Sequence, residues 1–393
     1  MSTRIVVKFG GADLSSAEKI QRAAQMVAEA PYDEIIVVVS AMGDMTDIIE
    51  KVISPLTKIT DADFADILSM GERLSARVFS STLRSLGVMS ETFDPSNDNW
   101  PIITDSCFKN AKPDIEKTTF LVKTHLVPKL GKIIPVVCGF LGKDMQGRVT
   151  TLGRGGSDTT AILLAKCVKA DEVLLVKQTN GVLSADPSFV ADAKPINKLE
   201  IREMFDLAQG GAKIVKPEAL KYKLPDQKLR IIDFSAGTLT SQGTEIIGSF
   251  SLTSAEMNSE QHLLAINVIC EVNTNNLTKL FQVFKSDLVY GVSSGSRSIT
   301  VFISKNDTKK ILNKLHEIHS FKAISHKEDV SLLQISHPTF IDSPGGVALI
   351  SSTLSRASIN ILEITTSKAT INVFIEEKQL KSAKEAIVNV FKP

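Results

Sequence analysis

The sequence has few cysteines, few aromatic residues and no long hydrophobic run. Its four cysteines among 393 residues have neither the density of a disulfide scaffold nor metal-ligand spacing, so they indicate a reduced, cytoplasmic protein. No apolar run approaches the ~18 residues of a membrane helix, and no signal peptide is evident. Lys and Arg total 45 against 44 Asp and Glu, a balance that argues against nucleic acid or another polyanion as partner.

The first 250 residues alternate between buried strands and helical patterns. Largely apolar runs occur at 5–7, 35–39, 133–138 and 172–176, as expected of strands covered on both faces of a parallel sheet. This alternation predicts an α/β domain. Other expected elements are helices at 15–30, 63–86 and 120–130, a short strand near Ile102, a hairpin at 142–149, a short helix beginning at Gly210 and carrying Lys213 and Lys216, and closing strands at 231–234 and 245–247.

The most informative stretch, Thr150 to Ala161, reads TTLGRGGSDTTA and runs into an apolar helical pattern. A glycine-rich turn that opens a helix presents backbone N–H groups and the positive end of the helix dipole, which favours an anion. Arg154 adds a planar fork suited to a carboxylate or phosphate. Ser157 and Asp158 read equally well as ordinary helix caps.

Strand ends elsewhere also carry polar or small residues. Lys8 precedes Gly10 and Gly11, a second strand, turn and helix arrangement without the P-loop pattern, although a strand-end lysine is often simply solvated. Ser40 and Thr46 follow the second apolar run, where open α/β sheets bind ligands.

The helical stretch at 63–86 contains Gly71 followed by Glu72. A glycine inside a helix suggests that something approaches that face closely. Glu72 is open to two interpretations, since it fits either a site residue or a surface charge paired with Arg73 or Arg77.

The chain after residue 250 has a different pattern. A polar stretch predicts a linker at 251–261, after which two similar βαββα units of about 65 residues occupy 262–328 and 329–393. These units suggest a ferredoxin-like pair, with strand exchange between units or chains as an option. The turn at 342–346, DSPGG, opens a helix in the second unit and fits either capping or ligand binding.

Six motifs in order resemble the aspartate kinase family across nearly the whole chain. They are KFGG at 8–11, VVSAMG at 38–43, GERLSA at 71–76, GF at 139–140, TTLGRGGSD at 150–158 and ADP at 185–187. The resemblance implies an α/β three-layer sandwich with a mainly parallel central sheet, the amino-acid kinase fold, over 1–250. Two ferredoxin-like βαββαβ ACT domains would follow it.

The family's activity is transfer of the γ-phosphoryl of ATP to the side-chain carboxylate of aspartate, the first step towards lysine, threonine and methionine. The resemblance makes Lys8 and Asp158 catalytic, with the lysine stabilising the phosphoryl group and the aspartate orienting it. Arg154 would clamp a carboxylate of aspartate and Glu72 would bind its ammonium group. The remaining positions that line this pocket in the family are Ser40, Thr46, Phe140 and Ser157.

The nucleotide half departs from the family pattern. TDVDGVYTADPR has become KQTNGVLSADPS at 177–188, KVLHP has become KIVKP at 213–217, and the Thr-Ser after KFGG is Ala12-Asp13. Ser188 stands where the family has an arginine, so one positive charge is lost on the phosphate side. Lys177 or Lys216 can restore that charge from another direction. The residues implied to bind ATP are Lys8, Gly10, Gly11, Gly155, Gly156, Lys177, Gln178, Leu183, Asp186 and Lys213. Mg²⁺ is expected on the nucleotide phosphates and waters, with no protein ligands.

The tail implies feedback inhibition by lysine or threonine and a homodimer or larger homo-oligomer formed through ACT domains. Effector-binding positions implied by the resemblance are Asp342, Ser343, Gly345, Gly346, Val347, Ile364 and Thr365. Two alternatives stay open: another carboxylate kinase of this fold, acting on glutamate or acetylglutamate, and an amino-acid sensor that has lost catalysis.

Overall fold

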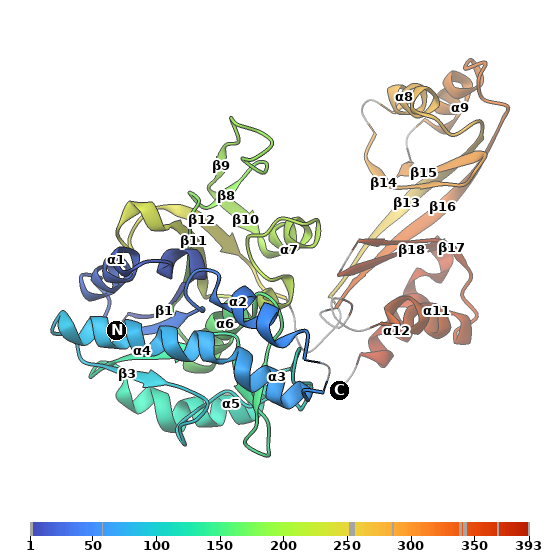
Figure 1. Cartoon of the computed structure of the whole chain (residues 1–393). Coiled ribbons are helices and arrows are strands. Elements are labelled where there is room, and N and C mark those ends of the chain that lie inside the picture. The colour runs from blue at the N-terminus through green and yellow to red at the C-terminus, as the bar shows by residue number, and fades with distance from the viewer. Residues whose placement is uncertain are drawn as a thin grey trace. The chain divides into compact units, whose positions relative to one another are not determined.

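The structure is a computed structural model that describes residues 3–56, 58–250, 256–284, 287–305, 307–337, 340, 344–367 and 369–391. The chain forms two compact units, Met1–Phe250 and Ser251–Pro393 (Figure 1). Within the described ranges, none of the helices combines the length and the apolar character that crossing a membrane requires.

An eight-stranded sheet forms the centre of the first unit, in the order β10-β12-β11-β7-β1-β2-β4-β3. Its strands are β1 (Arg4–Phe9), β2 (Glu34–Val39), β3 (Ser90–Phe93), β4 (Ile134–Cys138), β7 (Glu172–Lys177), β10 (Lys198–Glu200), β11 (Lys228–Asp233) and β12 (Gly243–Ile247). All neighbours are parallel except β11 and β12. Two hairpins stand outside the sheet, β5 (Leu141–Lys143) with β6 (Val149–Thr151), and β8 (Val182–Leu183) with β9 (Pro195–Ile196).

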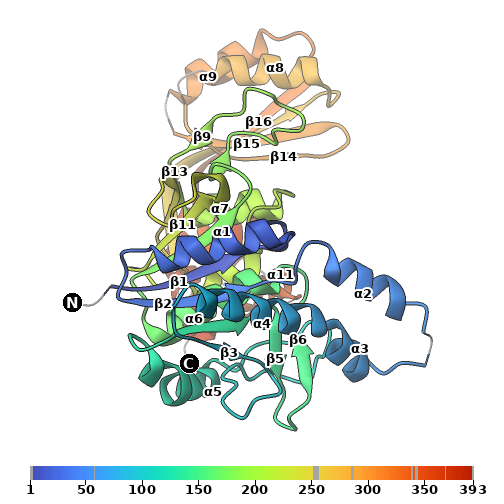
Figure 2. The same ribbon diagram turned by 60° about the vertical axis from the view of Figure 1, so that its left-hand side comes forward.

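Helices cover both faces of this sheet (Figure 2). They are α1 (Ala17–Ala28), α2 (Met45–Ile53), α3 (Asp61–Leu68), α4 (Met70–Ser85), α5 (Ile115–Leu121), α6 (Gly156–Val168) and α7 (Ile201–Gln209). Shorter 3₁₀ turns lie at Gly11–Leu14, Val127–Lys129, Pro217–Tyr222 and Phe234–Ala236, and a π turn at Val122–Leu126.

Strand β1 shows how the layers are arranged. Phe9 contacts the ring of Phe79 on α4 at 5.5 Å between ring centroids, whereas Lys8 contacts Asp158 on α6. Because successive side chains of a strand point to opposite faces, α4 and α6 lie on opposite sides of the sheet. The predicted three-layer α/β sandwich is therefore confirmed, and Lys8 reaches the α6 side at the carboxyl end of β1.

Four local predictions in this unit were wrong. The helix expected at 63–86 is broken at Ser69 into α3 and α4. Near the buried Ile102 the chain makes isolated bridges, from Ile103 to Lys143 and from Thr104 to Pro113, in place of a full strand, and the strand of this region is β3. The helix expected from Gly210 is absent from the described residues there, because α7 ends at Gln209 and Gly211 adopts a φ of +107°, which terminates a helix. The helix predicted at 120–130 is a succession of α, π and 3₁₀ turns.

A six-stranded antiparallel sheet organises the second unit, in the order β14-β15-β13-β16-β18-β17. Its elements are β13 (Glu256–Ile269), α8 (Thr274–Val283), β14 (Val289–Ser294), β15 (Ser298–Ser304), α9 (Thr308–His316), β16 (Ala323–Ser336), α11 (Gly346–Arg356), β17 (Ile361–Ser367), β18 (Thr370–Glu376), a 3₁₀ turn at Glu377–Gln379 and α12 (Leu380–Val390). The two halves have separate apolar cores, one beneath α8 and α9 and the other beneath α11 and α12.

Strands β13 and β16 run through both halves. The carboxyl half of β13 pairs with the start of β16 in the first half, while Glu256–Glu260 pairs with Leu332–Ser336 in the second. Each half thus completes a βαββαβ arrangement by sharing a strand, and the exchange occurs within one chain. The linker prediction was therefore wrong for residues 256–261: their polar side chains are exposed on a strand that backbone pairing holds in place. Residues 251–255 lie outside the described residues.

Candidate active site

A cavity of about 740 Å³ lies at the carboxyl ends of β1 and β2, in front of the first turn of α6. This is where open parallel sheets bind ligands. All six residues that the sequence assigned to the acceptor pocket line it, namely Ser40, Thr46, Glu72, Phe140, Arg154 and Ser157. Lys8, Gly11, Gly155 and Gly156 line the same cavity. The fold therefore brings the acceptor pocket together with four of the predicted nucleotide residues. The other six, Gly10, Lys177, Gln178, Leu183, Asp186 and Lys213, lie outside this lining.

A buried ion pair lies at the base of the cavity. Lys8 Nζ is 2.9 Å from Asp158 Oδ1, and the two side chains are 7% and 6% exposed. Lys177, at the end of β7, places its Nζ 3.3 Å from Oδ2 and 3.4 Å from Oδ1 of the same carboxylate. Asp158 therefore holds two ammonium groups from neighbouring strands.

The electrostatics of this trio follow from burial and charge. Burial raises the pKa of Asp158, but the charges of Lys177 and Lys8 and their hydrogen bonds outweigh that effect, and the pKa falls to about 2. Burial is also the main cause that lowers the pKa of Lys177, and Asp158 partly opposes it. Asp158 is consequently ionised throughout the physiological pH range and orients both lysines.

The glycine turn before α6 depends on backbone shapes that favour glycine. Gly153 and Gly155 have φ values of +73° and +74°, and Gly155 is the residue that caps α6. At Gly156, an added Cβ would lie 2.9 Å from Phe140 Cδ2 and from Leu152 Cβ. The turn is thus packed tightly while its helix end faces the cavity, an arrangement that suits an anion.

Phe140 is held in an unusual conformation on the cavity wall. Its φ is +67°, which is uncommon for a residue with a side chain. Its N–H donates to Thr160 Oγ1 at 3.0 Å, and its carbonyl accepts from the Leu152 N–H at 2.8 Å. These bonds to α6 and to the glycine turn hold a conformation that costs on the order of 1–3 kcal/mol.

Glu72 is a buried carboxylate with an unused oxygen. Its Oε1 accepts from the Ala41 N–H at 3.2 Å, whereas Oε2 has no hydrogen-bond partner among the described residues. Burial raises the pKa of Glu72 from an ordinary 4.5 to about 7, against smaller effects of backbone hydrogen bonds that lower it. A Cβ on Gly71 would lie 2.8 Å from Ala41 Cβ, so this glycine permits the close approach that the sequence indicated. Such an oxygen is suited to receive an ammonium group of a ligand.

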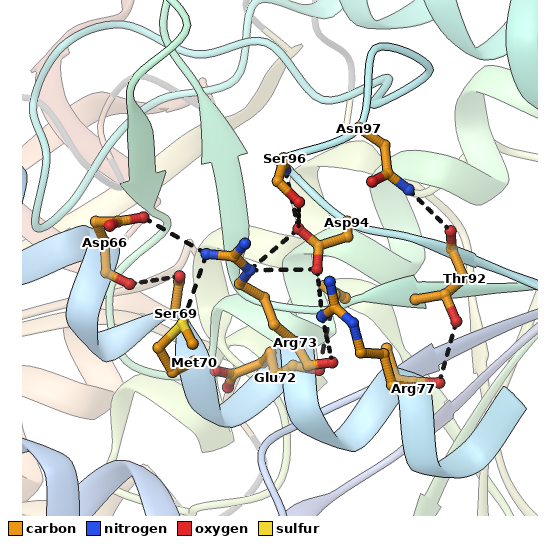
Figure 3. A network of polar contacts seen from close by, with 12 residues as sticks. Asp66, Ser69, Met70, Glu72, Arg73, Arg77, Thr92, Asp94, Ser96 and Asn97 are labelled. Carbon is orange, nitrogen blue, oxygen red and sulfur yellow. Dashed lines mark hydrogen bonds and ion pairs between the residues drawn. The ribbon is translucent and has the colours of Figure 1, made fainter. Parts of the chain in front are cut away.

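The surface-pair interpretation of Glu72 was wrong, because both arginines contact another acid (Figure 3). Arg73 Nε lies 3.1 Å from Asp94 Oδ1, and Arg77 Nη1 lies 2.5 Å from Asp94 Oδ2. The buried Asp94 also accepts from the Ser96 N–H and hydroxyl at 2.9 and 2.8 Å. Helix α4 therefore directs Glu72 towards the cavity and its arginines towards the loop after β3.

The cavity also contains two further cationic side chains, Arg154, which the motifs indicated, and Lys109, which they did not. Arg154 is 91% exposed, with one ion pair at 3.5 Å to Asp47 on α2. Lys109 lines the wall, pairs with Asp61 at 2.6 Å and lies 4.5 Å above the ring of Phe64. Lys109 lies in an irregular loop, where no periodic pattern or motif could have identified it.

Several of the residues predicted to bind the nucleotide do not line the cavity. The Gly10 N–H, which was predicted to bind phosphate oxygens, donates instead to Asp13 Oδ2 at 2.8 Å. Leu183 lies in β8, and Asp186 and Lys213 are exposed outside the cavity lining. Gln178 Nε2 donates to Asp13 Oδ1 at 2.5 Å. No cluster of three or more metal-ligating side chains occurs among the described residues.

In the second unit, Asp342 and Ser343 lie outside the described residues. Gly345 caps α11 with a φ of +96°, and Val347 is 41% exposed beside it. Ile364 packs against the second apolar core, and Thr365 Oγ1 accepts from Asn372 Nδ2 at 3.4 Å. A Cβ on Gly346 would lie 2.8 Å from the ring of Phe340, so this helix start is closely packed.

Comparison with known proteins gives a consistent result. The amino acid kinase family matches residues 3–233, and an ACT domain matches residues 325–389. An aspartate kinase of Pseudomonas fluorescens is 30% identical over 98% of this chain and 97% of its own length, and an aspartokinase of Corynebacterium glutamicum is 29% identical over 98% and 96%.

Solved structures agree at the level of the fold. The crystal structure of aspartate kinase from Synechocystis has a TM-score of 0.73 at 23% identity and covers 99% of this chain and 69% of that chain. E. coli aspartokinase III in complex with aspartate and ADP has a TM-score of 0.57 at 20% identity, with 98% of each chain covered. The chain therefore belongs to the amino acid kinase family, within its aspartate kinase group.

Proposed function

We propose that this chain transfers the γ-phosphoryl group of ATP to the side-chain carboxylate of aspartate, forming 4-phospho-L-aspartate. The observation that carries the proposal is the single cavity that Lys8, Glu72 and Arg154 all line. It offers a buried cation for a phosphoryl group, a carboxylate for an ammonium group and an exposed guanidinium for a carboxylate. Those three groups correspond to the charges of aspartate and of a transferring phosphoryl group.

Aspartate would be held at both ends. Arg154 would pair with its α-carboxylate, since the guanidinium has only a long contact to Asp47. The unused Oε2 of Glu72 would accept from its ammonium group. Ser40, Thr46, Phe140 and Ser157 would form the wall between these ends. The side-chain carboxylate of aspartate would then face Lys8 and the start of α6.

The reaction needs alignment and charge neutralisation more than it needs a base, because the attacking carboxylate is already ionised at neutral pH. A carboxylate oxygen forms a bond to Pγ while the bond from Pγ to the bridging oxygen of ADP breaks. Lys8 would stabilise the charge on the transferring group, and Asp158 would keep its ammonium in position through the 2.9 Å ion pair. The glycine turn and the end of α6 would bind phosphate oxygens.

ATP fits the chain's own residues at this site. Gly11, Gly155 and Gly156 line the cavity beside Lys8, where their backbone can approach phosphate oxygens. A Cβ on any of them would lie 2.7 to 3.0 Å from other protein atoms, so these tight turns require glycine. Mg²⁺ would be bound by the phosphates and by water and would neutralise charge there, so it would need no cluster of protein ligands.

Two other functions are compatible with the fold. An acetylglutamate kinase would not use Glu72, because an acetylated amine carries no positive charge to pair with the buried carboxylate. Glutamate is disfavoured only by its additional methylene group. A non-catalytic sensor would not require the buried Lys8–Asp158 ion pair, whose position at the phosphoryl end favours catalysis.

The test is an ADP-release assay on the purified full chain with aspartate, glutamate or acetylglutamate, with the acyl phosphate trapped by hydroxylamine. We expect aspartate-dependent ADP release and a hydroxamate product. Lys8→Met removes the cation and is expected to lower kcat at least about 100-fold. Lys132→Met, at an exposed position before β4, is the matched control. ADP release that is equal with and without aspartate, and unaffected by Lys8→Met, would refute the proposal.

We also propose that the second unit regulates this activity in response to lysine or threonine and joins chains into a homodimer or larger oligomer. The family resemblance of Gly345–Val347 at the start of α11 and of Ile364 and Thr365 on β17 supports this effector role. Asp342 and Ser343 are proposed from the sequence alone. We propose accordingly that the reaction is the first step of lysine, threonine and methionine synthesis. Activity that is insensitive to both amino acids, in the full chain and in Val347→Asp alike, would count against regulation.

A further inference from the structure

The carboxyl end of β7 brings Lys177, one of the two lysines that the sequence offered to restore charge, to the phosphoryl site. Strands β1 and β7 are parallel neighbours, with Lys8 opposite Leu175 and Phe9 opposite Val176. Lys177 therefore follows one position beyond Phe9, beside the turn that begins at Gly10. Its ammonium group and that of Lys8 meet at a single carboxylate, Asp158.

The ammonium of Lys177 is only partly satisfied. Its two contacts to Asp158, at 3.3 and 3.4 Å, are longer than an ordinary N–H···O bond, whereas Lys8 lies at 2.9 Å. No other acceptor contacts Lys177 Nζ among the described residues. The side chain is 21% exposed, against 7% for Lys8. An ammonium group has three donors, so Lys177 has donors left for an anion that enters from solvent.

A second hydrogen bond ties the same strand end to the glycine turn. Gln178 donates from Nε2 to Asp13 Oδ1 at 2.5 Å, and the Gly10 N–H donates to Asp13 Oδ2 at 2.8 Å. Asp13 is 1% exposed, and burial raises its pKa while Gln178, the Gly10 N–H, Lys8 and Lys177 oppose that change. Residues 165 positions apart thus fix the end of β7 against the turn after β1.

These contacts involve the positions at which the chain departs from the family pattern. The pattern has a serine at position 13 and an aspartate at position 178, and this chain has Asp13 and Gln178. The family pattern and this chain therefore both have one acid and one hydrogen-bond donor at these two positions, but the acid and the donor have changed places. Lys177 likewise adds a charge near the phosphates where Ser188 has removed one. The other candidate, Lys216, donates to the Leu152 carbonyl at 2.7 Å, so it supports the glycine turn instead.

The geometry points to Lys177 as a second catalytic cation, which contacts the transferring phosphoryl group together with Lys8, and to Asp13 and Gln178 as the pair that positions it. This inference rests on the proposed phosphoryl transfer. As the carboxylate oxygen bonds to Pγ and the Pγ–O bond to ADP breaks, the two ammonium groups share the charge of the equatorial oxygens. Asp158 keeps both in place and gains no proton.

The test compares Lys177→Met with Lys228→Met, which replaces an exposed lysine at the opposite end of the neighbouring strand β11. We expect Lys177→Met to lower kcat about 100-fold with the KM for aspartate within about 3-fold. Affinity for a non-hydrolysable ATP analogue should fall about 10-fold and affinity for ADP less than about 2-fold, since the contact is to the terminal phosphoryl group. Lys177→Arg, which keeps the charge, should recover part of kcat, and Lys228→Met should match the original chain.

A kcat within about 3-fold of the original, or equal losses of affinity for ADP and the analogue, would overturn the assignment of Lys177. The unfolding midpoint of each variant shows whether it is folded, and Lys177→Gln serves as a second variant if Lys177→Met does not fold. If the unmodified chain releases no ADP with aspartate, the proposed function fails. If the unmodified chain does release ADP with aspartate and Lys177→Met has the same kcat, only the inference about Lys177 fails.

The positioning pair has its own test, a rescue. Asp13→Ser leaves Gln178 without its acceptor, and Gln178→Asp places two carboxylates face to face, so each should lower kcat about 10-fold. The double variant restores one acid and one hydroxyl donor and should return kcat to within about 3-fold of the original. In the Lys177→Met background, Asp13→Ser should change kcat less than about 2-fold, because its effect acts through Lys177. If the losses in kcat are additive, either for Asp13→Ser with Gln178→Asp or for Asp13→Ser with Lys177→Met, Asp13 and Gln178 do not position Lys177.

Discussion

Replacing Glu72 by glutamine separates substrate binding from protein stability. In the free protein the pKa of Glu72 is about 7, because burial disfavours the carboxylate and one of its oxygens has no donor. An aspartate ammonium group at Oε2 would favour the ionised form, so the apparent affinity depends on the fraction of Glu72 that is ionised. The KM for aspartate should then rise as the pH falls below about 7, by about 10-fold at pH 6 relative to its value at high pH.

The assay is steady-state ADP release between about pH 5.5 and 7.5, where the groups of aspartate do not titrate. Glu72→Gln should bind aspartate weakly at every pH, with a KM that no longer depends on pH in this range. Glu50→Gln, in the same cavity on α2, should keep the pH dependence of the original chain. A pH-dependent KM that persists in Glu72→Gln would refute the assignment of Glu72 to the ammonium group.

The same group makes a prediction for stability in the absence of substrate. A carboxyl group whose pKa is raised on folding stabilises the protein below its unfolded value of 4.5, and this contribution is lost as the pH rises through about 7. The shift corresponds to roughly 3 kcal/mol at pH 8. Glu72→Gln should therefore be the more stable protein by urea unfolding at pH 8, and the difference should vanish near pH 4.5. A variant that is less stable at pH 8 would contradict this account of the burial of Glu72.

Three further predictions follow from the site and its supports. Arg154→Met should raise the KM for aspartate about 10- to 100-fold and change the free energy of unfolding by less than about 0.5 kcal/mol, because the side chain is 91% exposed with a single contact at 3.5 Å; a large loss of stability would contradict this. Asp94→Asn should lower the free energy of unfolding by about 3 kcal/mol at neutral pH, because it removes the buried charge that pairs with Arg73 and Arg77. Urea unfolding measures this loss, and Asp66→Asn, which removes the longer 3.6 Å contact of Arg73, is the control. Gly155→Ala should cost about 1–2 kcal/mol from its φ of +74° and also lower kcat by displacing the turn, whereas an unchanged kcat would remove the turn from the reaction.

Short-range signals predicted the central sheet and the acceptor pocket. The central strands β1, β2, β4 and β7 each contain an apolar run, and residues at the carboxyl ends of parallel strands meet at one edge of the sheet. Lys8, Ser40 and Ser157 could therefore be placed together from local patterns and from the family resemblance. Their roles stay predictions, but the cavity that they share is a property of the fold.

The features that the sequence did not reveal depend on contacts between distant residues. The pairing of Asp94 with Arg73 and Arg77 links a loop to a helix, and no spacing rule indicates which acid an arginine will contact. Strand β13 begins in a polar stretch, which is held by backbone pairing to β16 and by Met257, packed against the second apolar core. Ile102 is apolar because it is buried, and burial alone does not produce a strand.

The nucleotide side shows why motif departures need to be interpreted together. Taken singly, Asp13 and Lys177 are each unfavourable at their positions, since a buried carboxylate or ammonium without a partner costs several kcal/mol. In the structure each offsets another: Gln178 donates to Asp13, and Asp158 binds Lys177. A degraded site would leave such groups unpaired or replace them with apolar residues. Paired charges at the end of β7 therefore favour an active phosphoryl site with altered contacts over a sensor that has lost catalysis.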